Sequence, residues 1–335
     1  MKGGSSRGIF FSFSMILALV AVAFAGVKLA NMQYVFGVVI PYAAVLTFLI
    51  GVVFRVIKWG RSPVPFCIPT TCGQQKSLPW IKHSRFENPS STFDVVVRMA
   101  MEVFLFRTLF RNLKGETREG RVAYGSDKWL WLAGLVFHVT FFVVLVRHLR
   151  FFMEPVPFFV NLIDSLDGFM QVSTPHLLIT GVVLLLAAAY LFFRRISVPQ
   201  VRYISLASDY FPLFLIMGIA ISGILMRYFT KVDIVRVKAL TMGLVTLGPV
   251  VTDGVGAIFF IHLFLISVLL AYFPFSKLMH MGGVFLSPTR NMANNSRIKR
   301  HINPWNYPVK VHTYEEYEDE FRDKMKSVGL PLEKE

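Results

Sequence analysis

The chain has 335 residues, of which 54% are hydrophobic and only 16% are charged, and its mean hydropathy is +0.55. These values exclude an ordinary soluble globular protein and indicate an integral membrane protein. Two cysteines are too few for a disulfide-stapled secreted fold. The formal charge of +15 would suit a nucleic-acid partner, but its distribution among the loops accounts for it without one.

Six segments are long and apolar enough to cross the roughly 30 Å hydrocarbon core of a bilayer as helices. They cover residues 9–27, 33–54, 129–146, 174–193, 210–226 and 254–276. The sixth segment extends to His280 if Lys277 snorkels to the interface. The sequence therefore predicts an all-α, multi-pass protein of the cell membrane, built as a bundle of six transmembrane helices.

The first segment also has features of a signal peptide. Lys2 and Arg7 precede the apolar run, and the run ends in the A-x-A pattern Ala23-Phe24-Ala25. The run is longer than a usual signal-peptide core of about 7–15 residues, which favours a retained helix over a cleaved one. The other five spans keep their orientation in either case.

The basic residues set the orientation of the bundle. If the N-terminus is cytoplasmic, 28 of the 35 Lys and Arg residues lie on the cytoplasmic side and seven lie outside. Because cytoplasmic loops carry the excess of Lys and Arg, both termini are predicted to be cytoplasmic. Topology then explains the positive charge, and no nucleic-acid partner is expected.

The spans divide the chain into four parts: an N-terminal transmembrane hairpin (1–57), a cytoplasmic loop (58–127), a four-helix core (128–284) and a cytoplasmic tail (285–335). Residues 147–173 and 227–253 of the core form outer loops with room for short helices. In the tail, residues 314–326 are predicted to form a surface helix.

The cytoplasmic loop has two halves. Four prolines between Pro63 and Pro79 predict an irregular first half. The second half, FDVVVRMAMEVFLFRTLFRNLK, mixes apolar residues with charges, which predicts either an interfacial amphipathic helix or a helix packed on a soluble partner. We expect residues around Cys67 to Trp80 to bind such a partner, because the loop is the largest cytoplasmic surface.

Cys67 and Cys72 form a C-x4-C pair in this loop. Two thiols alone cannot complete a four-ligand zinc or iron–sulfur site, and the spacing is wider than that of a redox C-x-x-C motif. Packing within the docking loop is the favoured interpretation. A redox or shared-ligand role is the alternative.

The histidines carry the strongest functional signal. Three of them are predicted to lie on the cytoplasmic surface, namely His83, His301 and His312. His176 is predicted to be an interfacial or capping residue at the start of the fourth span. The other four occur as two pairs, His138 with His148 on the third span and His262 with His280 on the sixth.

The spacings place these histidines at two depths. His138 and His148 are ten residues apart, which is about 15 Å of helix and roughly 80° of rotation. His262 and His280 are 18 residues apart, five full turns, so a continuous helix would carry them on one face about 27 Å apart. The histidines are about 15 Å apart along one helix and about 27 Å apart along the other. For the histidines to meet in pairs, the helices must tilt or the sixth helix must kink, and Pro274 is a place for such a kink.

The two spans run antiparallel, so His138 meets His280 on the cytoplasmic side and His148 meets His262 on the outer side. A polar group inside a membrane is costly unless it is paired or functional. A single histidine inside the membrane would be interpreted as a hydrogen-bonded side chain without a ligand. Two facing pairs instead suit two haems, each with an imidazole at both axial positions of its iron. A haem closed in this way transfers electrons and does not readily bind oxygen. The alternative is a transporter or permease with proton-relay histidines, whose inverted repeats the sequence lacks.

These residues resemble the nitrate reductase gamma subunit family. The resemblance rests on the pattern FH…RHL at 137–149, the two histidine spacings and the stretch FPFSKLMH, and it covers about residues 33–285. The extra first span and the loop IPTTCGQQKSLPW resemble the DsrM branch, whose members are the membrane cytochromes b of DsrMKJOP complexes, with relatives in heterodisulfide-reductase-like menaquinol-oxidising complexes.

The resemblance implies two haems b, with His138 and His280 on the cytoplasm-side iron and His148 and His262 on the outer iron. It also implies quinol chemistry near the outer haem. The family's quinol-binding lysine, about twenty residues after the second ligand, is replaced here by Gly168. The quinone-site candidates are therefore chosen by their position in the outer loop. The simpler interpretation is that each is an ordinary interfacial or loop charge. The candidates are Arg150, Glu154, Asp164 and Asp167.

The expected function is a quinol-oxidising electron-transfer subunit. Menaquinol (the reduced form of menaquinone) would be oxidised on the outer side, and electrons would pass to a cytoplasmic iron–sulfur subunit resembling heterodisulfide reductase in sulfur-compound respiration. Further membrane and cytochrome c subunits are expected partners, besides membrane lipid. The sequence leaves the direction of electron flow open.

Overall fold

The computed structural model describes residues 3–63, 73–111, 113–170, 175–251, 254–295, 297–298 and 311–334. Within these ranges, six helices are long and apolar enough to cross a membrane. They cover Ser6–Lys28, Val35–Gly60, Lys128–Phe151, Ile179–Ser197, Ala207–Thr230 and Ala257–Phe275. The six predicted spans are confirmed, with ends that shift by a few residues.

The spans are built from α-helices with short π or 3-10 extensions. They are α1 (Gly3–Lys28), η1 (Val35–Val39) with α2 (Ile40–Gly60), α5 (Lys128–His148) with η2 (Leu149–Phe151), α7 (Ile179–Ser197), α9 (Ala207–Ile224) with η3 (Leu225–Thr230), and α11 (Ala257–Tyr272) with η4 (Phe273–Phe275). Shorter helices connect or follow them: α3 (Thr92–Leu105), α4 (Arg107–Phe110), α6 (Phe158–Asp167), α8 (Pro199–Ile204), α10 (Ile234–Val245), η5 (Lys277–Met279), α12 (His280–Leu286), α13 (Pro288–Asn291) and α14 (Tyr314–Ser327).

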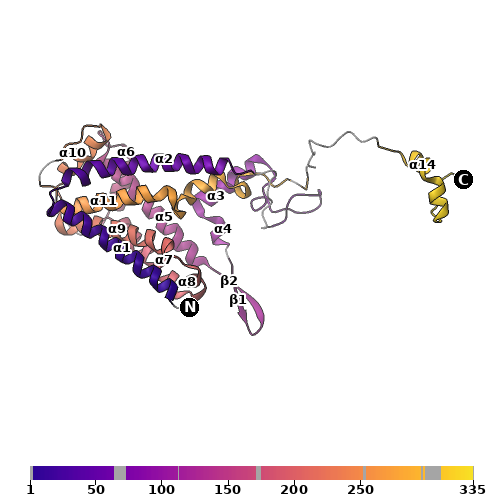
Figure 1. Cartoon of the computed structure of the whole chain (residues 1–335), viewed down its shortest axis with the longest axis horizontal. Helices are drawn as coiled ribbons and strands as arrows, with labels where there is room; N and C mark the ends of the chain where they lie inside the picture. The colour runs from indigo at the N-terminus through magenta and orange to yellow at the C-terminus, as the bar shows by residue number, and fades with distance from the viewer. Residues whose placement is uncertain are drawn as a thin grey trace.

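The spans form one elongated bundle (Figure 1). Helix α11 packs on α1, α2 and α9, whereas α5 packs mainly on α7, and α7 in turn packs on α9. The bundle has a His280 end, where α2 finishes and α5 and α9 start, and a His262 end, where α6 and α10 lie (Figure 1). The N-terminus lies at the His280 end. The side of the membrane that each end faces stays a prediction.

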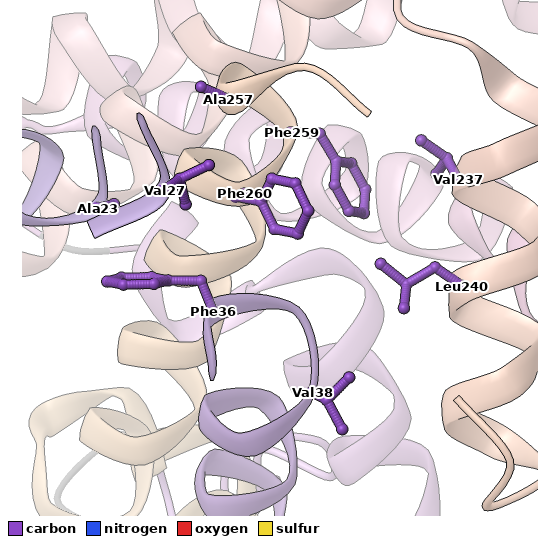
Figure 2. Packing of buried hydrophobic residues seen from close by; sticks show 9 residues of the cluster. All are labelled: Ala23, Val27, Phe36, Val38, Val237, Leu240, Ala257, Phe259 and Phe260. Atoms are coloured by element: carbon purple, nitrogen blue, oxygen red, sulfur yellow. The ribbon is translucent and has the colours of Figure 1, made fainter. Parts of the chain in front are cut away.

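Apolar side chains from the first two spans meet α10 and α11 at the His262 end (Figure 2). Ala23, Phe36, Leu240 and Phe260 are almost fully buried there. Gly26 allows the close approach, because a Cβ at this position would lie 2.3 Å from the ring of Phe36. The first span thus contributes to this core, and its retention stays a prediction.

The connecting segments contain one feature that the sequence reading missed. Residues Leu113–Arg118 (β1) and Arg121–Ser126 (β2) pair as an antiparallel hairpin, which projects from the bundle (Figure 1). The turn residues Glu119 and Gly120 both have positive φ, as a two-residue hairpin turn requires. The all-α expectation is therefore wrong at this hairpin, although the chain is mostly helical.

Helices expected outside the spans are confirmed. The outer loops hold α6 and α10, the tail holds α14, and the amphipathic part of the 58–127 loop forms α3. Helix α3 leaves large apolar side chains exposed, including Phe93, Val96 and Phe104, which fits both interpretations of that segment. Cys67 and Cys72 lie outside the described residues, together with the rest of residues 64–72.

Candidate functional site

The sixth span breaks before it reaches His280. Helix α11 ends at Tyr272, Ser276 is extended with φ −113° and ψ 178°, and His280 opens the separate helix α12. The expectation of one continuous helix with both histidines on one face is therefore wrong, and the kink near Pro274 is confirmed. Pro274 packs against Gly51 of α2, where a Cβ would lie 2.7 Å from its ring.

The break brings His280 to His138, as predicted. Their ring centres are 5.8 Å apart, and the ring planes are at 87°. Phe106 and Phe137 pack edge-on against the ring of His138 at 4.9 and 5.1 Å. Phe106 lies in the left-handed region between α3 and α4, so the loop before α5 covers one side of this pair.

His148 and His262 form the second predicted pair, at the other end of the bundle. Their ring centres are 6.4 Å apart, and the planes are only 22° from parallel. His262 is buried, and Gly223 of α9 lies close to it, since a Cβ there would meet its Cε1 at 3.3 Å. The two pairs therefore differ in ring orientation and in burial.

Hydrogen bonds fix the tautomer of three histidines. The Nδ1 atoms of His138, His148 and His280 lie 2.7, 2.6 and 2.9 Å from the carbonyl oxygens of Gly134, Val144 and Lys277. A carbonyl oxygen only accepts, so each Nδ1 must carry the proton. Each Nε2 is then an unprotonated nitrogen with a free lone pair.

The fourth histidine uses a side chain instead of a carbonyl. The Nδ1 of His262 lies 2.8 Å from the hydroxyl of Ser222, and that hydroxyl donates to the carbonyl of Ile219 at 3.0 Å. A hydroxyl has one proton, so it accepts from Nδ1–H and leaves Nε2 free here too. The sequence reading missed Ser222, although a lone serine in an apolar span opposite a histidine is a usable signal.

The spacing of both pairs suits two imidazoles on one metal ion. A histidine nitrogen binds such an ion at about 2 Å, and the ring centre lies about 1 Å further back, so two trans rings have centres roughly 6 Å apart. Among the described residues, no group of three or more His, Cys, Asp or Glu side chains could hold a metal ion. A haem brings the other ligands of its iron in its own ring, so two imidazoles are enough to hold it.

Among the described helices, α5 and α11 do not pack closely on each other. Helix α5 packs on α7, and α11 packs on α1, α2 and α9, so each histidine pair joins two helices that have different neighbours.

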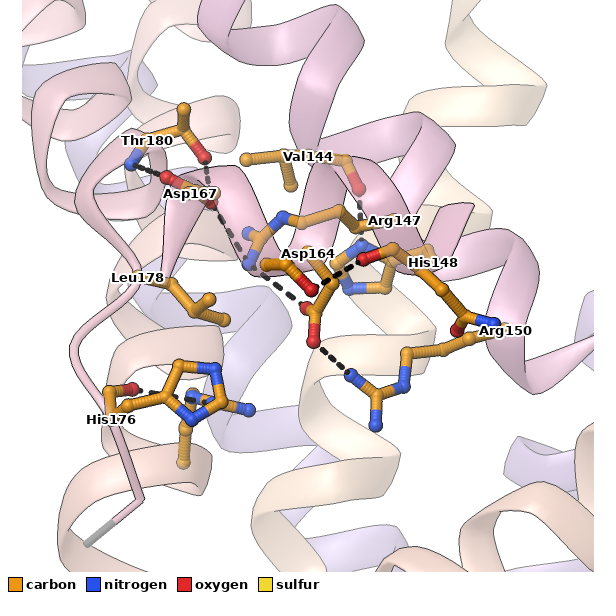
Figure 3. Close-up of polar contacts among 12 residues, drawn as sticks. Val144, Arg147, His148, Arg150, Asp164, Asp167, His176, Leu178 and Thr180 are labelled. Carbon is orange, nitrogen blue, oxygen red and sulfur yellow. Dashed lines mark hydrogen bonds and ion pairs between the residues drawn. The ribbon is translucent and has the colours of Figure 1, made fainter. Parts of the chain in front are cut away.

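Charged residues gather beside His148 (Figure 3). Arg147 is buried and lies 3.0 Å from Asp167 and 3.9 Å from Asp164, while Arg150 lies 3.1 Å from Asp164. Asp167 also accepts from the backbone N–H of Thr180 at 2.7 Å and from its hydroxyl at 2.6 Å. This network joins α5, α6 and the start of α7.

The structure brings together three of the four quinone-site candidates. Arg150, Asp164 and Asp167 belong to this network, whereas Glu154 pairs separately with Lys238 of α10. The Oδ1 atom of Asp164 is buried without a hydrogen-bond partner in the described structure. That atom can accept a proton or a hydrogen bond from a bound molecule.

Ion pairs also order the segment that precedes the hairpin. Glu87 lies within 2.9 Å of Arg107 and 2.6 Å of Arg111. Burial alone would raise the pKa of Glu87, but hydrogen bonds and the charges of these arginines outweigh it and hold that pKa below its usual range. The same holds for Asp94, whose pKa is lowered by Arg85 and Ser91 against the effect of burial.

Of the remaining histidines, the three that the structure describes are not brought to either pair. His176 is half-buried and its carbonyl accepts from Arg227 at 3.2 Å. His312 is exposed, as predicted, whereas His83 is half-buried. His301 lies outside the described residues.

Comparisons with known proteins agree with this architecture. A model of the nitrate reductase gamma subunit family matches residues 93–300, more than half of the chain. The Hdr-like menaquinol oxidoreductase cytochrome b-like subunit of Archaeoglobus fulgidus is 46% identical over 278 residues, which cover 81% of this chain and 83% of that protein. Its counterpart from Archaeoglobus profundus is 44% identical over 273 residues, 79% of this chain and 81% of that protein.

The family match includes all four paired histidines and begins in α3. The similarity to the two Archaeoglobus proteins extends over about four fifths of the chain. Together with six apolar helices, these matches establish a multi-pass membrane protein. The chain belongs to the nitrate reductase gamma subunit family.

Proposed function

We propose that this chain is the cytochrome b subunit of a membrane menaquinol oxidoreductase and holds two haems b. His138 and His280 would bind one iron, and His148 and His262 the other. One observation carries the proposal: two facing imidazole pairs, with ring centres 5.8 and 6.4 Å apart, stand at opposite ends of one bundle. The names of the Archaeoglobus relatives support the cytochrome b and menaquinol parts.

The hydrogen bonds of the histidines fit axial ligation. All four Nδ1 atoms are engaged and all four Nε2 atoms are left as donors to a metal. When bound, each haem would supply an iron that takes up and gives up one electron at a time, held by the two imidazoles of its pair. The protein's part is to hold the imidazoles and to keep each Nδ1 proton in place.

We place quinol oxidation at the His262 end, next to the charged network. Oxidation of menaquinol to menaquinone releases two electrons and two protons. The Oδ1 of Asp164, which accepts no hydrogen bond in the described structure, and the neighbouring guanidinium of Arg150 would offer an acceptor and a donor to the two quinol oxygens. Asp167 is more fully engaged, with Arg147 and Thr180, and would orient Arg147 rather than contact quinol.

Electrons would leave at the His280 end, which the distribution of Lys and Arg assigns to the cytoplasm. The proposed acceptor is an iron–sulfur subunit resembling heterodisulfide reductase, as in the DsrM branch, with further membrane and cytochrome c subunits in the complex. The relatives' description as Hdr-like supports this partner class. The surface formed by the 58–127 loop is the proposed dock.

A reduced-minus-oxidised optical spectrum of the purified chain tests the class directly. We expect a b-type signal and two haems per chain. His138→Ala or His280→Ala should remove one haem, and His148→Ala or His262→Ala the other, while His312→Ala, an exposed control, should keep both. Two haems in all four variants would refute the ligand assignment, and a chain without a b-type signal would favour the proton-relay transporter.

A further inference from the structure

The acceptor for the Nδ1 proton of His280 differs from the acceptors of the other histidines. Gly134 and Val144 lie inside the continuous helix α5, and Ser222 lies inside α9. Lys277, in contrast, belongs to a three-residue 3-10 turn that follows the extended Ser276. The regular hydrogen bonds of a long helix therefore do not hold the carbonyl that orients His280.

The side chain of Lys277 holds this turn instead. Its Nζ lies 2.6 Å from Oδ1 of Asp209, in the first turn of α9. The side chain of Asp209 is only 8% exposed, whereas that of Lys277 is 67% exposed. An exposed lysine is thus tied to a buried carboxylate.

Asp209 is itself fixed by other contacts. Its Oδ2 accepts from the backbone N–H of Leu206 at 3.0 Å, which closes the first turn of α9. Arg195 of α7 lies 3.9 Å from its Oδ1. The carboxylate is therefore held by the start of α9 and lies near Arg195 of α7, and Lys277 is joined to it by one direct ion pair.

We propose that the ion pair between Asp209 and Lys277 is a positioning device that sets the ring orientation of His280. The proposal rests on the proposed function, in which His280 is an axial ligand. Lys277 connects the two contacts within one residue: its ammonium group binds Asp209, and its carbonyl accepts from Nδ1 of His280. The 87° angle between the rings of His138 and His280 is the orientation that this residue maintains.

The neighbouring contacts support this role without duplicating it. The hydroxyl of Ser276 accepts from the N–H of Leu278 at 3.1 Å and donates to the carbonyl of Phe273 at 2.9 Å. These bonds shape the turn locally, but they do not connect it to α9. Among the described residues, Lys277 provides the ion pair between this turn and α9.

The test uses the whole chain with its haems. We compare Lys277→Met, which removes the charge and keeps the apolar stem, with Lys277→Arg, which keeps the charge, and with Asp209→Asn. Lys58→Met is the matched control, because Lys58 is exposed at the same end of the bundle. Each variant is assayed for haem content, for the low-spin electron paramagnetic resonance signals and for the midpoint potentials of both haems.

We expect Lys277→Met to keep both haems and to shift the resonance signal and the potential of the haem at the His280 end, with the other haem unchanged. Lys277→Arg should restore both readouts. Asp209→Asn should reproduce the shift, and the double variant should shift no further than either single one, because both changes remove one interaction.

Several results would overturn the inference. These are an unchanged signal in Lys277→Met, an equal shift of both haems, the same shift in Lys58→Met, or additive shifts in the double variant. His280→Ala separates this inference from the proposed function. If that variant loses one haem while Lys277→Met changes nothing, the ligand stands and the positioning role fails; if that variant keeps both haems, the ligand assignment itself fails.

Discussion

Replacing Ser222 with alanine should weaken one haem site and leave the other intact. Ser222 accepts the Nδ1 proton of His262 at 2.8 Å and donates its own proton to Ile219. Both Ser222 and His262 are buried, with 6% and 7% of their surfaces exposed. Alanine would therefore deprive the Nδ1–H of a proposed haem ligand of its hydroxyl acceptor, in a place that water reaches poorly.

The size of the effect follows from that missing hydrogen bond. An unsatisfied buried donor costs about 1–3 kcal/mol. At about 1.4 kcal/mol per factor of ten, the affinity for haem at this site should fall about 10–100-fold, which is the range typical of changes to the partners of metal ligands. The bond also makes the imidazole a stronger electron donor, so its loss should raise the midpoint potential of this haem.

The assay is haem content per chain combined with an optical redox titration, read against His262→Ala as the reference for loss of the same haem. Ser222→Thr keeps a hydroxyl and should retain most of the affinity. Ser267→Ala is the matched control, because Ser267 is equally buried but bonds only to the carbonyl of Leu263 in its own helix. An unchanged haem content and potential in Ser222→Ala, or an equal loss in Ser267→Ala, would refute the reasoning.

Two further predictions concern orientation and pH. A cysteine placed at Val235, which is 78% exposed in α10, should react with an impermeant maleimide in intact cells. A cysteine at Val122 in β2 should react only after lysis. The reverse labelling pattern would contradict the predicted orientation. Because the pKa of Glu87 is lowered in the folded chain, its ion pairs stabilise the segment above the ordinary glutamate pKa of about 4.3 and lose that effect as the pH falls further. Limited proteolysis near residues 73–111 should therefore accelerate below about pH 4. Glu87→Gln should reduce that acceleration but not abolish it, because the pKa of Asp94 in the same segment is lowered as well.

The sequence predicts the six spans and both histidine pairs because long apolar runs and helical spacing are local properties. The pairing of His138 with His280 needs only the antiparallel order of the spans. The backbone path that leads to His280 was predicted less well. The sixth span is broken over residues 273–279, so a count of five helical turns does not describe it, although Pro274 indicates where the break occurs.

The partners of the histidines could not be predicted, because they depend on contacts between distant helices. Ser222 reaches His262 across 40 residues and Asp209 reaches Lys277 across 68. The hairpin was missed for another reason. Its strands carry charged and small residues instead of an alternating apolar face, so only the Glu119-Gly120 turn indicates it.

The packing of α1 has a consequence for the order of events during synthesis. The hydroxyl of Ser12 bonds to the carbonyl of Ala207 at 3.1 Å, across 195 residues. At about 5–20 residues per second, a ribosome needs roughly 10–40 s to make the intervening chain. The face of the first helix that meets α9 must therefore stay in lipid, with the proton of Ser12 satisfied within its own helix, until α9 arrives. The helix that is made first thus completes its packing late.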